Sequence, residues 1–181
     1  RIGMSRSRYW PLAITGLLLL GLTGGALAEK SLKAIMPFEG EGTVYQIAPE
    51  TMLFLGAFEG IIYAETAEGK LDEGFIRCPG SQTIDMKTGK TSGEGYCMIT
   101  PSAGDVVYAT WSCRGEVGGC KGDFKLTSGT GQYEGISGSS KLIVRSALNT
   151  LVVGMSSGSA IREATGIAIL PELSYTIPEK K

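Results

Sequence analysis

The sequence has few candidate functional side chains, and Glu59 is the first of them. It is the one ionisable residue in the apolar run Met52–Tyr63 (MLFLGAFEGIIY). A carboxylate among apolar neighbours is expected to be buried or paired with a donor, and such groups are enriched at functional sites. Glu59 is therefore a candidate ligand-binding residue. The alternative is a rim position or an ion pair with a lysine of a neighbouring strand.

The usual catalytic groups are missing from the sequence. It has no histidine, which excludes Ser-His-Asp and Cys-His nucleophilic systems and argues against zinc chemistry. Ser137 lies in Gly-Ile-Ser-Gly-Ser rather than Gly-x-Ser-x-Gly, and no pair of carboxylates stands out. The glycines at 129–138 precede the strand-like Lys141–Arg145 and not a helix, so they do not form a phosphate-binding loop. We predict no catalytic residue, no metal and no cofactor.

The four cysteines predict two disulfides. Cys78 and Cys97 are nearly equidistant from the turn Lys87–Lys90, so a hairpin there places them opposite each other. Cys113 and Cys120 flank a glycine-rich turn and are expected to face each other across it. The alternative is a metal site, but paired C-x-x-C spacing is absent.

Residues 1–28 have the pattern of a secretory signal peptide. Arg6 and Arg8 precede the apolar Leu12–Leu22, and Ala26–Ala28 is a small-x-small cleavage site that would leave Glu29 as the mature N-terminus. We expect a periplasmic or secreted protein, which suits the predicted disulfides. The alternative is an uncleaved anchor. The apolar run is short for a membrane span and no later segment approaches one, so we expect no stable span after cleavage.

The rest of the chain, 29–181, is predicted to be one domain. Loss of the three leader arginines would change the net charge from −1 to −4, because the leader holds no other charged residue. That mild acidity provides no basic surface for nucleic acid or anionic lipid.

Short runs of strand-forming residues, bounded by turn signals, predict an all-β fold. We count eight or nine strands and no helix, which favours an antiparallel barrel over a sandwich. The segments that carry strand signals are Gly42–Ala48, Met52–Glu65, Leu71–Cys78, Ser81–Met86, Ser92–Ile99, Val106–Cys113, Lys121–Ser128, Leu142–Leu148, Leu151–Met155 and Ala160–Leu170. Glu29–Pro37 is expected to be a loose lead-in, and Pro171 to end the last strand.

The segment Cys120–Ser140 (CKGDFKLTSGTGQYEGISGSS) resembles the turn G-G-T-G-x-[FY]-x-G-x-x-G of the allene oxide cyclase and dirigent family, with Ser128 at a position where the family prefers glycine. Uncharacterised secreted bacterial members also carry W-x-C…G-C-x-G, similar to Trp111–Cys113 and Gly119–Gly122 here. The resemblance implies a calycin-like, eight-stranded barrel with an apolar interior, often oligomeric. The catalytic residues of the plant enzymes have no counterparts that we can place.

These observations favour a non-catalytic binder of a small apolar or aromatic ligand inside the barrel. Glu59, Tyr63 and Trp111 are the expected polar and aromatic lining, and small side chains would leave the room for the ligand (Ala57, Ala109, Ala164 and Gly166). One alternative is a structural or interaction protein with a filled barrel, whose outer apolar residues serve self-association. The other is a shape-selective isomerase or cyclase that uses Glu59.

Overall fold

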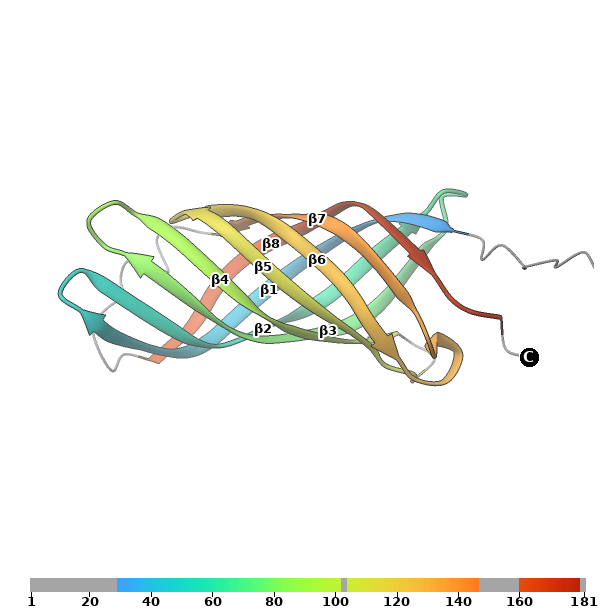
Figure 1. The fold of residues 1–181 in the computed structure, drawn as a ribbon, viewed down its shortest axis with the longest axis horizontal. Coiled ribbons are helices and arrows are strands. Elements are labelled where there is room, and N and C mark those ends of the chain that lie inside the picture. The colour runs from blue at the N-terminus through green and yellow to red at the C-terminus, as the bar shows by residue number, and fades with distance from the viewer. Residues whose placement is uncertain (1–28, 102–103, 147–159, 180–181) are drawn as a thin grey trace, which may run out of the picture.

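The computed structural model describes residues 29–101, 104–146 and 160–179 and forms a closed antiparallel barrel (Figure 1). Its strands are β1 (Lys30–Ala48), β2 (Thr51–Thr66), β3 (Leu71–Asp85), β4 (Lys90–Pro101), β5 (Val107–Glu116), β6 (Gly119–Gly129), β7 (Ser137–Ser146) and β8 (Ala160–Thr176). A short 3-10 helix, η1 (Gly131–Tyr133), lies between β6 and β7. The predicted eight-stranded, all-β barrel is confirmed.

Each strand pairs with the next along the chain, and β1 also pairs with β8 to close the wall. Side chains alternate between the inside and the outside along every strand, as pleated strands require. On β4, for example, Thr91 and Cys97 are buried, whereas the intervening Ser92 and Glu94 are exposed. Within the described residues, no helix has the length and hydropathy of a membrane span.

Three expectations about strand ends were wrong. Residues 30–37 are not a loose lead-in but the first half of β1, because Ala34 and Phe38 point into the core and the backbone pairs with β2 and β8. Leu71–Cys78 and Ser81–Met86 belong to the single strand β3. Pro171 does not end β8, because the pairing with β1 shifts there in a bulge and continues to Tyr175.

Of two other predicted strands, one has different bounds in the structure and one lies outside the described residues. The strand expected at Leu142–Leu148 begins earlier, at Ser137, and is described as far as Ser146. The strand expected at Leu151–Met155 lies outside the described residues.

Both predicted disulfides are present, and both lie among the buried core residues. Cys78 on β3 and Cys97 on β4 have Cα atoms 4.0 Å apart. Cys113 and Cys120 are not directly opposite: Cys113 pairs with Gly122 and Gly115 with Cys120, so this disulfide is diagonal, with a Cα separation of 5.6 Å. The centre of the second hairpin therefore lies one residue later in the chain than its cysteines suggested.

Replacing each disulfide by a pair of alanines should separate their contributions to stability. The chain-entropy model assigns about 3.3 kcal/mol to the longer Cys78–Cys97 loop and about 2.5 kcal/mol to the Cys113–Cys120 loop. We expect urea unfolding to show a loss of this order for each double variant, larger for C78A/C97A. A variant that unfolds at the same urea concentration as the parent would contradict the assignment of that disulfide as a structural clamp.

Candidate ligand-binding site

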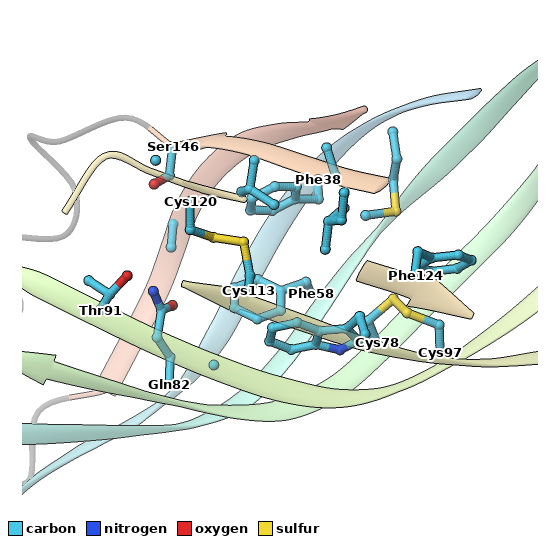
Figure 2. A pocket seen from close by; sticks show the side chains of 18 of the residues that line it. Phe38, Phe58, Cys78, Gln82, Thr91, Cys97, Cys113, Cys120, Phe124 and Ser146 are labelled. Atoms are coloured by element: carbon cyan, nitrogen blue, oxygen red, sulfur yellow. A yellow bond between two sulfur atoms is a disulfide. The ribbon is translucent and has the colours of Figure 1, made fainter. Parts of the chain in front are cut away.

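An apolar cavity of about 90 Å³ (the space open to the centre of a water molecule) lies inside the barrel (Figure 2). All eight strands contribute to its lining. Its deeper wall is formed by aliphatic, aromatic and sulfur-containing side chains: Ala34, Met36, Phe38, Phe58, Ile62, Ile76, Cys78, Cys97, Trp111, Cys113, Cys120, Phe124, Leu142, Val144, Ala168 and Leu170. None of these side chains carries a charge, so the deep cavity suits an apolar molecule.

Four aromatic rings organise this part of the interior, with Phe58 at their centre. The Phe58 ring centroid lies 5.3 Å from that of Phe38, 5.6 Å from that of Phe54 and 5.8 Å from that of Trp111. The contacts with Phe38 and Trp111 are edge-to-face, a favoured arrangement for aromatic pairs. Phe58 also packs against both buried clusters of the core, so it couples the two halves of the barrel.

The indole of Trp111 lies against inward-facing glycines of β3 and β4. A Cβ atom on Gly80 would come within 2.6 Å of Trp111 Cζ2, and one on Gly95 within 2.7 Å of Trp111 Nε1. At Gly93 the corresponding distance to the indole is 3.2 Å. Side chains at these positions would push the ring into the cavity. The glycines therefore hold the indole close to the wall and keep the space beside it open.

Polar side chains line the cavity only towards one end, where the β5–β6 turn forms part of the rim. Gln82, Thr91 and Ser146 lie there, together with the exposed Glu116. Figure 2 shows Gln82 and Thr91 close together on one side of this opening and Ser146 on the other. The β1–β2 and β3–β4 turns are at the same end of the barrel in Figure 1. We call this end the mouth.

The opposite end of the barrel is filled. Leu126, Ile136 and Leu173 are buried there, and Tyr133 and Tyr175 pack against them; none of the five lines the cavity. Burial raises the pKa of both tyrosines, which keeps their hydroxyl groups neutral. Among the described residues, side chains therefore close this end of the barrel to a ligand.

Two buried polar atoms of the cavity lining have no hydrogen-bond partner within the described residues. They are Thr91 Oγ1 and Trp111 Nε1. Thr91 is 7% exposed, so water has little access to its hydroxyl from outside the barrel. A buried polar group without a partner costs about 1–3 kcal/mol. Thr91 Oγ1 is therefore a free hydrogen-bonding group near the polar end of the lining, whereas Trp111 Nε1 lies on the side of the indole that faces Gly95.

The size of the cavity limits what it can hold. An engineered cavity of about 150 Å³ in another protein binds benzene. The cavity of about 90 Å³ is smaller, so a single aromatic ring requires small side-chain shifts. Met36 is the lining side chain best suited to move, because methionine is unbranched and adaptable. The interior therefore fits a molecule of about one ring.

Of the three predicted site residues, only Trp111 lines the cavity. Glu59 and Tyr63 share the outer face of β2, so the expectation that they line the interior was wrong. Glu59 forms an ion pair with Arg77 across the β2–β3 pair, with Oε1 2.8 Å from Nε. Tyr63 is 38% exposed, and both residues border a groove on the outer wall that also includes Phe75. The ion-pair alternative for Glu59 is the one observed, with arginine in place of lysine.

The predicted small interior residues also divide. Ala164 lines the cavity, Ala109 is buried in the core, and Gly166 lies on the inner face of β8 against Phe38, whereas Ala57 is buried on the outer face of β2, between Leu55 and Glu59. Gln82 and Thr91 were not predicted as site residues. Their position on the inner face follows from the register that brings Cys78 opposite Cys97, so that pairing would have identified them.

The site offers apolar surface and a few neutral hydrogen-bonding side chains to a ligand. The side chains that line the deep cavity have no titratable group apart from the disulfide-bonded cysteines, and the polar groups at the mouth are neutral except for Glu116 at the rim. Among the described residues, no group of three or more His, Cys, Asp or Glu side chains could hold a metal ion.

The unpartnered hydroxyl predicts that Thr91→Val stabilises the ligand-free protein. Valine keeps the shape of threonine and removes the buried polar group, so we expect the free energy of unfolding to rise by about 1 kcal/mol. Thr110→Val is the matched control on the outer side of β5 and should change it by less than about 0.5 kcal/mol. Urea unfolding measures both, and a destabilised Thr91→Val protein would show that the hydroxyl already has a partner.

The outer position of Glu59 predicts that Glu59→Gln has little effect. An ion pair with this exposure contributes under about 1 kcal/mol, so the loss in unfolding free energy should stay below that value. Binding of small aromatic molecules should be unchanged. Glu94→Gln, at another outward position, is the control. Loss of binding in Glu59→Gln alone would place the site on the outer wall.

Comparisons with known proteins assign no family to this chain. No protein-family model matches the sequence, and no curated protein matches it. A solved structure, that of the pterocarpan synthase dirigent protein GePTS1, aligns with a TM-score of 0.39 and 12% sequence identity, over 86% of this chain and 90% of that chain. A likeness this low assigns neither family nor function, so the geometry of the barrel must carry any functional conclusion.

Proposed function

We propose that this protein is an exported, non-catalytic binder of a small apolar or aromatic molecule, which it holds inside the barrel. One observation carries the proposal: an apolar cavity, with polar side chains at one end and filled at the other, has polar atoms in its wall that find no partner among the described residues. Burying one aromatic ring in such a space is favourable, because apolar surface leaves water on both partners.

The two alternatives have less support. A barrel that serves only as a structural element would gain stability from filling the space beside Trp111, which the glycines instead leave open. A cyclase or isomerase based on Glu59 would need that carboxylate in the interior, whereas it pairs with Arg77 outside.

Export and self-association extend the proposal. The two disulfides suit an oxidising compartment, in agreement with the leader-like residues 1–28. The outer wall exposes neighbouring apolar side chains on adjacent strands, such as Ile61 opposite Phe75 and Ile35 opposite Tyr63. A surface of this kind is typical of proteins that associate, and we propose a homo-oligomer on that basis.

Trp111 provides a direct test of binding in the cavity. The sequence has two tryptophans, so in the full chain Trp10→Phe leaves Trp111 as the single fluorescent indole. Titration with toluene or benzyl alcohol should change its emission and saturate. Native mass spectrometry of protein from its own host should also show an added small mass. No saturable change with either probe would contradict the proposed function.

A cavity-filling variant shows where the probe binds. Ala168 lines the cavity, so Ala168→Leu should weaken binding at least tenfold in the Trp10→Phe background. Ala48→Leu adds the same side chain at an exposed position at the end of β1 and should leave binding unchanged. Circular dichroism confirms that both variants fold. Equal binding by both would place the ligand outside the barrel.

A further inference from the structure

The three neutral polar side chains at the mouth form a second part of the binding site. Resting on the proposed function, we propose that Gln82, Thr91 and Ser146 are a subsite that selects ligands with a neutral hydrogen-bonding group on an apolar body of about one ring. A hydroxyl or carbonyl group is the chemistry that such a subsite would recognise.

The register of the strands brings these residues to one level of the barrel. Gln82 pairs with Gly93 and Ile84 with Thr91, so Gln82 and Thr91 are diagonal neighbours on the inner face of β3 and β4. Diagonal neighbours lie about 7–8 Å apart at their backbones, within reach of a shared ligand atom. Ser146 comes from the last residue of β7 and faces them across the mouth (Figure 2).

Within the described residues, the side chains of these three make no hydrogen bond. Thr91 Oγ1 is also buried. Together they offer an amide N–H₂ group, an amide carbonyl and two hydroxyls. A hydroxyl or carbonyl on a ligand could therefore accept from one of them, and a hydroxyl could also donate to another.

The charges around the mouth favour a neutral group. Among the described side chains, Glu116 is the charged one that accompanies these three in the lining; it is exposed at the rim and lies opposite Lys90 across the β4–β5 pair. An anion would lose its hydration beside a hydroxyl that cannot neutralise it, and would also approach the Glu116 carboxylate. A cation would also lose its hydration, and the Glu116 carboxylate would attract it less because Lys90 lies opposite that carboxylate. A neutral head group avoids both costs.

Four one-ring probes that differ in their head group test this proposal on the Trp10→Phe full chain. Benzyl alcohol has a neutral hydroxyl, toluene has no head group, benzoate is an anion, and benzylamine is a cation at neutral pH. One net hydrogen bond corresponds to roughly 3- to 10-fold in affinity. We expect benzyl alcohol to bind more tightly than toluene by this factor, and both ions to bind more weakly than benzyl alcohol.

Variants of the subsite assign the preference to its residues. Thr91→Val should weaken benzyl alcohol binding by roughly 3- to 10-fold and leave toluene binding equal or tighter. Ser146→Ala is the milder second variant, and it should also reduce the preference for benzyl alcohol over toluene. It keeps the test available if Thr91→Val does not fold. Thr110→Val, on the outer side of β5, should bind all four probes like the parent.

The outcomes separate the two proposals. Equal binding of toluene and benzyl alcohol by the parent protein would overturn the subsite while leaving the apolar binding site intact. Benzoate or benzylamine binding as tightly as benzyl alcohol would overturn the neutral selection. An unchanged preference in both Thr91→Val and Ser146→Ala would remove these residues from the subsite. Binding of none of the probes would contradict the proposed function itself.

Discussion

Closure of the wall by the pairing of β1 with β8 is the constraint on which the rest of the structure depends. Once the first and last strands are hydrogen-bonded, every strand has two partners and the alternation of side chains becomes a division between inside and outside. Ala34 and Phe38 then face Leu170 and Gly166 in the interior, while Ile35 and Ile169 remain outside. The cavity, its aromatic lining and its mouth all follow from this division.

The interior combines two demands that oppose each other. A barrel of this size is most stable when side chains fill it completely, as they do around Leu126 and Leu173. Towards the mouth the chain gives up part of that packing: glycines keep the Trp111 indole against the wall, and Thr91 buries a hydroxyl without a partner. Local losses of stability of this kind are common at functional sites. Their position on one cavity wall is the reason to regard this region as a binding site.

Much of the fold could be predicted from the sequence, because strand signals and turn signals are local. The alternation around the Lys87–Lys90 turn identified the Cys78–Cys97 pair, and the apolar run ending at Trp111 identified a residue of the cavity lining. Proline misled at Pro171, because a bulge lets the strand continue beyond a residue that usually ends it. Residues 30–37 looked like a terminus, since only long-range pairing with two other strands makes them a strand.

The site was harder to predict, because both faces of β2 are apolar. Alternation placed Glu59 and Tyr63 on one face and Phe54 and Phe58 on the other, but it could not say which face is inside. Which face of β2 points into the barrel depends on contacts with strands that are distant in the sequence. The aromatic contacts of Phe58 with Phe38 and Trp111 fix it.

The central claim is that a small apolar molecule occupies the inside of the closed wall. Methyl NMR of the full chain with toluene tests it most directly, because an aromatic guest shifts the resonances of the methyl groups that it touches. Ile61 and Ile62 are adjacent in the chain but lie on opposite faces of β2. The account predicts ring-current shifts at Ile62 and Ile76 with Ile61 and Ile35 unchanged. Shifts confined to Ile61 and Ile35 would contradict it.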